Sequence, residues 1–171
     1  MAFVVDVLYF KQKDDGLIIK EMAIVSTDSD ENPKVYLFKP PFSWYKLSKE
    51  CRRKNLFLEL YHHGLDWKSG TLEFNSIISV LQSHLSDATI IYVNNNELKE
   101  WMENFNCKMI NLTEMGYEND IFSTSNCNHH NRAYRTSCAL HNVTTMKQFV
   151  SKHRERKRRI IDELFSEDIV G

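Results

Sequence analysis

Two Cys-x-x-His pairs joined by a short polar segment constrain the fold of this chain more than any other feature. Cys127 and His130 form the first pair, and Cys138 and His141 form the second. The segment between them, residues 131–137, is hydrophilic and shows no apolar period. Thiolate sulfur and imidazole nitrogen are ligands that zinc prefers, and two local turns can bring four of them to one ion. The spacing predicts a structural zinc site formed by Cys127, His130, Cys138 and His141.

The fourth ligand is the open part of this prediction. His141 is the local choice, but a helix starting just before it could turn its ring away. His129, His63 and a distant carboxylate are rivals for the same position. A buried cysteine can also be only a small apolar side chain, so the alternative is a packed turn without a metal.

Length and composition indicate an ordinary intracellular protein. With 171 residues, the chain is expected to form one domain with a substantial core. The first residues lack the basic and apolar regions of a signal peptide, and no stretch approaches the roughly 20 apolar residues of a membrane span. We therefore expect a nuclear or cytoplasmic location without membrane contact, where the four cysteines are thiols or metal ligands rather than disulfides.

Charge is concentrated near the end of the chain. Residues 152–159 carry six basic side chains and one acidic side chain, and residues 162–168 are acidic. This pattern divides the chain into a domain over 1–153 and a basic, then acidic, tail over 154–171. Clustered cations bind nucleic acid phosphates or act as nuclear import signals, although a solvated helix extension is the alternative. The candidate nucleic-acid contacts are Arg154, Arg156, Lys157, Arg158 and Arg159.

Hydrophobic periodicity predicts an α/β fold. The expected elements, in order, are strands over 3–10, 17–25 and 34–39, helices over 43–61 and 71–84, a strand over 87–93, a helix over 97–105, a strand over 108–112, and a helix over 139–152. Three strands in an antiparallel meander, followed by strand–helix units, make a five-stranded mixed sheet flanked by helices. This order resembles the ribonuclease H-like fold.

Three short segments resemble motifs of the DEDD 3′-to-5′ exonucleases of that fold. Residues 4–8 resemble the first catalytic strand, residues 91–98 the strand-to-helix motif, and residues 138–143 the start of the last helix. The resemblance implies a site in which four carboxylates hold two divalent ions.

Only one of those four carboxylates is present in this sequence. It is Asp6, and the other three positions fall at Leu8, at Leu98 or its neighbour Glu97, and at Asn142, with Ser137 near the general-base histidine position. Leucine cannot replace the hard oxygen ligands that two metal ions need. We therefore expect a pseudonuclease rather than an enzyme, with Asp6 and Glu97 as the remaining catalytic candidates.

The Cys127-x-x-His130 pair followed by Cys138 is also similar to the Maelstrom domain, a ribonuclease H-like domain without the four carboxylates. The resemblance implies a zinc site of glutamate, cysteine, histidine and cysteine, for which Glu50 and Glu59 are the candidate glutamates. It further implies a non-catalytic domain of a small-RNA silencing pathway, with RNA, single-stranded DNA or a silencing protein as partner. This chain is short for that family and has no HMG box.

Two other functions remain open at this point. One is a metal-dependent nuclease whose ligands have migrated, with Asp6, Glu21, Glu97 and His141 as candidates. The other is a protein-interaction module derived from a mobile element or a virus, which would touch no nucleic acid.

Overall fold

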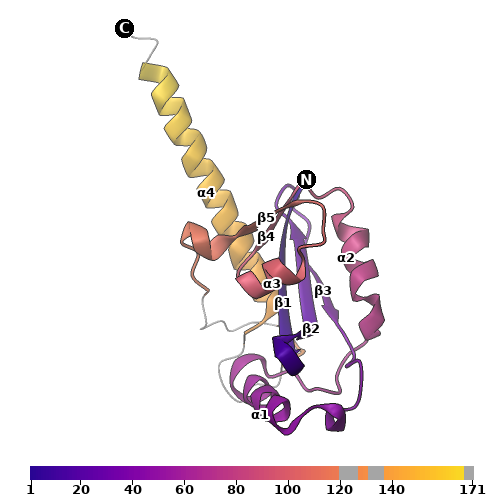
Figure 1. Cartoon of the computed structure of the whole chain (residues 1–171). Helices are drawn as coiled ribbons and strands as arrows, with labels where there is room; N and C mark the ends of the chain where they lie inside the picture. Colours follow the sequence, from indigo (N-terminus) through magenta and orange to yellow (C-terminus); the bar gives the residue numbers. More distant parts are fainter. Residues whose placement is uncertain (120–126, 131–136, 168–171) are drawn as a thin grey trace.

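The sheet has five strands in the order β3-β2-β1-β4-β5 (Figure 1). The structure, a computed structural model, describes residues 1–119, 127–130 and 137–167. β1 (Ala2–Lys11), β2 (Leu17–Ser26) and β3 (Lys34–Leu37) are antiparallel neighbours. β4 (Ile90–Val93) pairs with β1 in parallel, and β5 (Lys108–Asn111) pairs with β4 in parallel. The predicted α/β class and the mixed sheet of a meander followed by parallel strands are confirmed.

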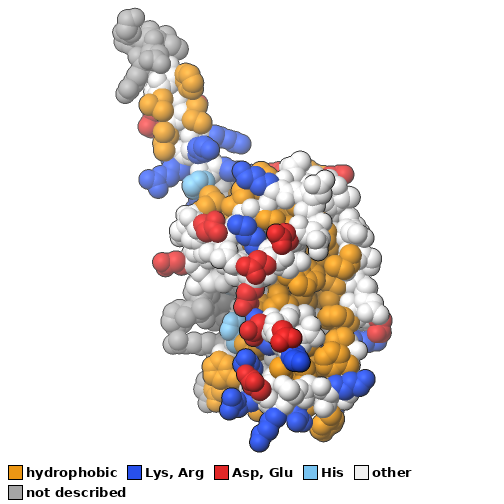
Figure 2. All heavy atoms as spheres, viewed as in Figure 1, with side chains coloured by type: hydrophobic (Ala, Val, Ile, Leu, Met, Phe, Trp, Pro, Cys, Tyr) orange, Lys and Arg blue, Asp and Glu red, His pale blue; other side chains and the backbone are white. Residues whose placement is uncertain are grey.

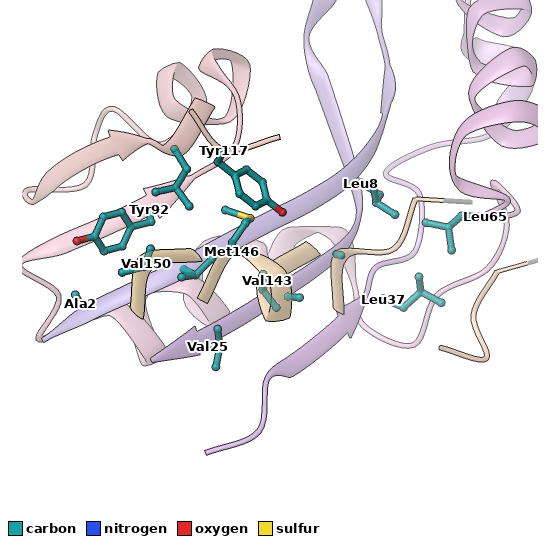
Figure 3. Packing of buried hydrophobic residues seen from close by; sticks show 14 residues of the cluster. Ala2, Leu8, Val25, Leu37, Leu65, Tyr92, Tyr117, Val143, Met146 and Val150 are labelled. Atoms are coloured by element: carbon teal, nitrogen blue, oxygen red, sulfur yellow. The ribbon is translucent and has the colours of Figure 1, made fainter. Parts of the chain in front are cut away.

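Helices cover both faces of this sheet, because successive strand residues point to opposite sides. Val4 packs toward α4 (Ala139–Glu167), whereas the next residue, Val5, packs toward α2 (Ile77–Leu85) and α3 (Asn96–Trp101). Figure 3 shows Val143, Met146 and Val150 of α4 lying over the strands. The alternation puts Asp6 and Glu21 on the face that α4 covers, together with the apolar residues Ala2, Val4, Ala23 and Val25.

The first helix is shorter than the predicted 43–61. Residues Trp44–Lys46 form a 3₁₀ turn, and α1 covers only Lys49–Leu58. The side chain of Ser48 accepts a hydrogen bond from the backbone N–H of Cys51 at 3.1 Å, which fixes the start of α1. A π-helical turn, Glu59–His63, continues the helix to Gly64.

The second helix begins six residues later than predicted. Backbone N–H groups of Thr71 and Leu72 donate to the carbonyl of Leu37 at 2.9 and 3.1 Å, so this segment extends the edge of β3 instead. A 3₁₀ turn at Phe74–Ser76 then leads into α2. Gly70, directly before Thr71, has a φ of 142°, and a Cβ at this position would lie 2.3 Å from the backbone nitrogen of Lys39.

Lys20 holds the loop that follows the π-helical turn against the end of β3, from inside the protein. Only 1% of Lys20 is exposed, and its ammonium donates to the carbonyls of Phe38 at 2.9 Å, Trp67 at 2.8 Å, and Ser69. Trp67 is buried against Phe10 in the small core beneath α1. Three carbonyl acceptors satisfy all three ammonium protons, which is what a buried lysine requires.

The last helix is much longer than the predicted 139–152. α4 has 29 residues and crosses residue 153 without a break. Residues 151–166 of α4 are not buried, and the helix projects away from the sheet after Val150 (Figure 1). Across the described ranges, no helix combines the length and apolarity that crossing a membrane would take.

Candidate metal centre

Four buried side chains with metal-binding chemistry meet under the start of α4. They are Glu21, Cys127, His130 and Cys138, and one ligand atom from each lies within 4.8 Å of the others. Glu21 comes from β2, Cys127 and His130 come from the short turn at 127–130, and Cys138 directly precedes α4. A group that could hold a metal ion therefore brings β2 together with two segments that follow it by more than 100 residues.

Glu21 is fully buried, and both of its carboxylate oxygens lie next to donor groups of the described residues. Its Oε2 atom lies 3.0 Å from Nε2 of His130 and accepts from the backbone N–H of Ala139 at 3.4 Å. Its Oε1 atom accepts from the thiol of Cys127 at 3.5 Å. A buried carboxylate is costly unless a positive charge compensates it, and a divalent cation would do so here.

His130 is held in the tautomer that a metal ligand needs. Its Nδ1–H donates to the backbone carbonyl of His63, which can only accept. When the ring loses its other proton to bind a metal, the lone pair lies on Nε2, the atom that faces Glu21. Metal-bound histidines are commonly oriented by this kind of backbone contact. Nε2 is buried and lies 3.0 Å from Oε2 of Glu21.

The pKa values reflect a cluster that holds protons in the absence of metal. Burial alone would lower the pKa of His130, but hydrogen bonds with Cys138 and Glu21 raise it to about 10. A hydrogen bond with Cys138, together with burial, raises the pKa of the Cys127 thiol well above its ordinary value. A metal ion would displace these protons, since thiolate and neutral imidazole are the forms that bind.

Two separations between donor atoms lie close to the spacing of tetrahedral zinc ligands, one inside that range and one slightly below it. Zinc bonds of about 2.0–2.3 Å at tetrahedral angles place neighbouring ligand atoms about 3.3–3.8 Å apart. The separations here are 3.0 Å between His130 Nε2 and Glu21 Oε2, and 3.5 Å between Cys127 Sγ and Glu21 Oε1. None of the cysteines Cys51, Cys107, Cys127 and Cys138, all of which the structure describes, forms a disulfide that would compete for the sulfur ligands.

The structure brings together three of the four predicted ligands and replaces the fourth. Glu21 occupies the position predicted for His141, which lies in the first turn of α4 outside the group. The group contains Glu21 in place of the predicted local ligand, because the register of β1 and β2 carries Glu21 to this point. Among the other rivals, His129 lies 3.7 Å from Glu21 but is partly exposed, and His63 contributes only its carbonyl.

The two glutamates suggested by the Maelstrom resemblance also lie elsewhere. Glu50 is on the exposed surface of α1, in an ion pair with Lys54 at 3.2 Å. Glu59 follows in the π-helical turn and is not part of the group. The signal for Glu21 was present in the sequence: Lys20 and Glu21 are two adjacent charges inside an otherwise apolar strand.

A second polar site lies next to the first, where Asp6 faces α4. The site is a cavity of about 120 Å³ at the carboxyl ends of β1 and β4. Asp6 accepts from Nδ2 of Asn142 at 2.7 Å, and the same amide reaches the hydroxyl of Ser137 at 3.1 Å. Asn94, just after β4, also contributes a hydrogen bond to Asp6. Burial raises the pKa of Asp6 to about 7, and the hydrogen bonds from Asn142, Val7 and Asn94 only partly oppose this.

Glu97 does not join Asp6 in this cavity. Its carboxylate accepts from the hydroxyl of Tyr9 and from Lys11 at 2.8 Å, on a partly exposed surface. Within the described parts of the chain, no group of three metal-binding side chains forms around Asp6. The cavity therefore presents one carboxyl group surrounded mainly by neutral amide and hydroxyl groups.

The basic residues predicted to contact nucleic acid lie on the projecting part of α4. Arg154 is anchored to the domain by an ion pair with Asp28 at 2.8 Å and lies over the ring of Tyr92. The next basic residues are exposed, and Figure 2 shows blue side chains where α4 leaves the body of the protein.

Comparison with known proteins gives no family for this chain. No family model matches the sequence, and no curated protein or solved structure matches it either.

Proposed function

We propose that this chain is a non-catalytic, zinc-stabilised domain of the ribonuclease H-like fold that binds RNA or another single-stranded nucleic acid. The observation that carries the proposal is the convergence of Glu21, Cys127, His130 and Cys138 on one buried point. Two sulfur ligands and an imidazole favour zinc over magnesium or calcium, which prefer oxygen. A set of four protein ligands leaves no open position for water, so the ion is structural.

The proposed zinc ion links β2 to segments that lie far from it in the sequence. The turn at 127–130 lies between two stretches outside the described residues, and β2 lies more than 100 positions earlier in the chain. Zinc would hold this turn and the start of α4 against the sheet. Structural zinc sites contribute folding free energy directly, so removing the ion is expected to lower stability.

Metal content tests this part of the proposal. Purified protein should contain one zinc per chain by elemental analysis, and Cys127→Ser and Cys138→Ser should lose it. Cys107→Ser is the matched control, because Cys107 is partly exposed and outside the cluster. A chelator should remove the zinc and lower the melting temperature. Metal-free protein that melts like the untreated sample would contradict a structural ion.

The non-catalytic part of the proposal is supported by the Asp6 cavity. Two-metal nuclease chemistry needs several carboxylates at one point, whereas Asp6 meets Asn94 and Asn142. The protein should therefore leave single-stranded RNA and DNA intact in magnesium and in manganese. Metal-dependent degradation that disappears in Asp6→Asn would favour the rival function, a nuclease with migrated ligands.

Nucleic acid binding is supported by the exposed basic run on α4. Neighbouring cations without paired anions repel one another, and phosphates relieve this repulsion while releasing counterions. Binding to labelled oligonucleotides should weaken steeply as salt increases. Replacing Arg156, Lys157, Arg158 and Arg159 by Gln should abolish it, while the same number of Gln substitutions at Lys13, Lys34, Lys68 and Lys108 should have little effect. Equal loss in both variants would indicate a general charge effect and no site on α4. As the alternative partner, we propose a protein of a small-RNA silencing pathway.

A further inference from the structure

The buried group of metal-binding side chains has a further donor beside it that reaches solvent. The side chain of Glu21 is 0% exposed and that of His130 is 1% exposed, whereas the neighbouring side chain of His129 is 42% exposed. His129 belongs to the same short turn as two of the proposed ligands, between Cys127 and His130. A metal site needs an entry path as well as ligands. His129 stands where such a path would reach the buried group.

His129 lies at ligand distance from Glu21. Its Nδ1 atom is 3.7 Å from Oε1 of Glu21. This separation is too long for a hydrogen bond, but it matches the about 3.3–3.8 Å expected between two ligand atoms of one zinc ion. The same oxygen lies 3.5 Å from the Sγ atom of Cys127. One oxygen of Glu21 therefore adjoins both a buried thiol and an exposed imidazole.

His129 is nevertheless not a member of the group of four. The ligand atoms of that group all lie within 4.8 Å of one another, and the group does not include His129. An imidazole that is close to Glu21 without being close to all four ligands can share an ion with only part of the group. Its position suits a donor that holds an ion during entry or exit better than a permanent ligand.

The backbone of the turn fixes His129 in this position. The backbone N–H of His129 donates to the sulfur of Cys127, which opposes the rise in the pKa of that thiol. The following residue, His130, is held through its Nδ1 atom by the backbone carbonyl of His63. Contacts on both sides of His129 thus keep its imidazole beside Glu21, while the ring still reaches solvent.

The four proposed ligands differ in how well they suit zinc. Thiolate and imidazole are soft or borderline donors, whereas the carboxylate of Glu21 is the hardest donor of the set. Zinc has no geometric preference from its d-electrons and can expand from four to five ligands, so a new donor can bind before an old one leaves. Glu21 is therefore the ligand most easily exchanged, and His129 is the donor beside it.

We propose that His129 is an exchange ligand through which zinc enters and leaves the buried group. On exit, the lone pair of His129 Nδ1 forms a bond to the ion as the bond from the Glu21 carboxylate breaks, and no electron is transferred. Entry follows the same steps in reverse. The bound zinc then equilibrates with zinc in solution without unfolding of the domain. This inference rests on the proposed function, because it requires zinc in the group of four.

An exchange ligand differs measurably from a residue that only orients Glu21. An orienting residue outside the ligand set contributes to affinity, by roughly 10–100-fold. An exchange ligand lowers the barrier in both directions equally, so its loss slows uptake and release together and leaves the affinity unchanged. Rates and affinity must therefore be measured on the same proteins.

The test uses the zinc-loaded full chain and the variant His129→Ala. His153→Ala is the matched control, because His153 is an exposed histidine on α4, outside the group. Stopped-flow mixing with an excess of a chromogenic chelator gives the rate of zinc release, and competition at equilibrium gives the affinity. His129→Ala should release zinc at least about tenfold more slowly than the unmodified chain and the control. Its zinc affinity should change by less than about twofold.

Free imidazole provides a second measurement on the same variant. Added imidazole supplies the donor that His129→Ala lacks, so it should restore much of the lost rate of zinc release. It should have a smaller effect on the unmodified chain and on His153→Ala, which keep the imidazole of His129. Slow release that imidazole does not restore would attribute the effect to the shape of the turn and would overturn the proposal.

Two further results would overturn it. Equal release rates for His129→Ala and the unmodified chain would show that zinc leaves by another route. A loss of zinc affinity of about tenfold or more in His129→Ala would make His129 a permanent ligand or an orienting residue. Elemental analysis separates these outcomes from a failure of the proposed function. A chain without zinc overturns both proposals, whereas bound zinc with unchanged release rates overturns only the exchange role.

Discussion

Two acidic residues on one face of the sheet have entirely different surroundings. Asp6 on β1 and Glu21 on β2 both point toward α4, and both are at most 1% exposed. The start of α4 supplies a partner to each, the side chain of Asn142 for Asp6 and the backbone N–H of Ala139 for Glu21. Glu21 meets sulfur and nitrogen donors that favour a cation, whereas Asp6 meets amides that stabilise it without adding charge. Burial alone therefore does not determine whether a carboxyl group is suited to bind a cation, because this depends on the groups that surround it.

The largest effect is expected from removing a sulfur ligand on the Glu21 side. Cys138→Ser should lose zinc and roughly 5 kcal/mol of stability, because most of the ion's binding free energy is folding free energy. For a chain of this size, that corresponds to a decrease of about 10–20 °C in melting temperature. Differential scanning fluorimetry with and without chelator measures it. If Cys107→Ser lowers the melting temperature as much, the effect comes from cysteine packing and not from metal.

The next largest effect is expected from Asp6, and it should depend on pH. The pKa of Asp6 is raised from 3.8 to about 7, so the folded state holds a proton that the unfolded state has lost between these values. The stability linked to Asp6 is therefore fully present below pH 4 and is lost as the pH rises through 7, by at most about 4 kcal/mol. Asp6→Asn should be more stable than the unmodified chain at pH 8, and the difference should shrink toward pH 4. If the stability of both proteins changes equally with pH, the pKa of Asp6 in the folded state has its ordinary value.

A smaller effect is expected from Glu21→Gln. The amide keeps the size of the ligand but removes its charge, so zinc affinity should fall by at least the roughly 10–100-fold that losing a partner outside the ligand set costs, while the two thiols and His130 still bind. The decrease in melting temperature should be well below that of Cys138→Ser. Competition with a chromogenic chelator gives the affinity. Unchanged affinity would remove Glu21 from the ligand set and reopen the fourth position.

The smallest effect is expected from converting the neutral site into an acidic one. Asn142→Asp places a second carboxyl group against Asp6, and the pair then resembles part of a hard-metal site. Adding magnesium at about ten times its dissociation constant should raise the melting temperature of this variant by a few degrees, through mass action. The unmodified chain should not respond. A similar response in both proteins would show that Asp6 already binds a divalent ion with its present neighbours.

The sequence predicts the parts of this molecule that depend on local patterns. The meander, the parallel strands and the three clustered ligands Cys127, His130 and Cys138 all follow from short-range spacing, and the structure contains each of them. Glu21 could not be found in the same way. Its role depends on the pairing of Leu8 with Glu21 across two strands and on which face α4 covers, and neither is written in the spacing around the cysteines.

The predicted ends of the helices differ from the observed ones for a related reason. The predicted helices over 43–61 and 71–84 each include residues whose backbone is used elsewhere, by the Ser48 cap in one case and by pairing with Leu37 in the other. The end of α4 was missed because the apolar stripe changes to a basic run after Val150. Charged residues with good helix propensity continue a helix without any need for burial.

The length of α4 has a consequence for whatever meets its far end. A helix rises 1.5 Å per residue, so the 27 steps from Cys138 to Phe165 amount to about 40 Å. Since the helix is continuous, it works as a stiff spacer whose base is fastened at the cluster. A molecule held at its tip is therefore kept at a set distance and bearing from the sheet, and loosening the base would swing that molecule through a wide arc.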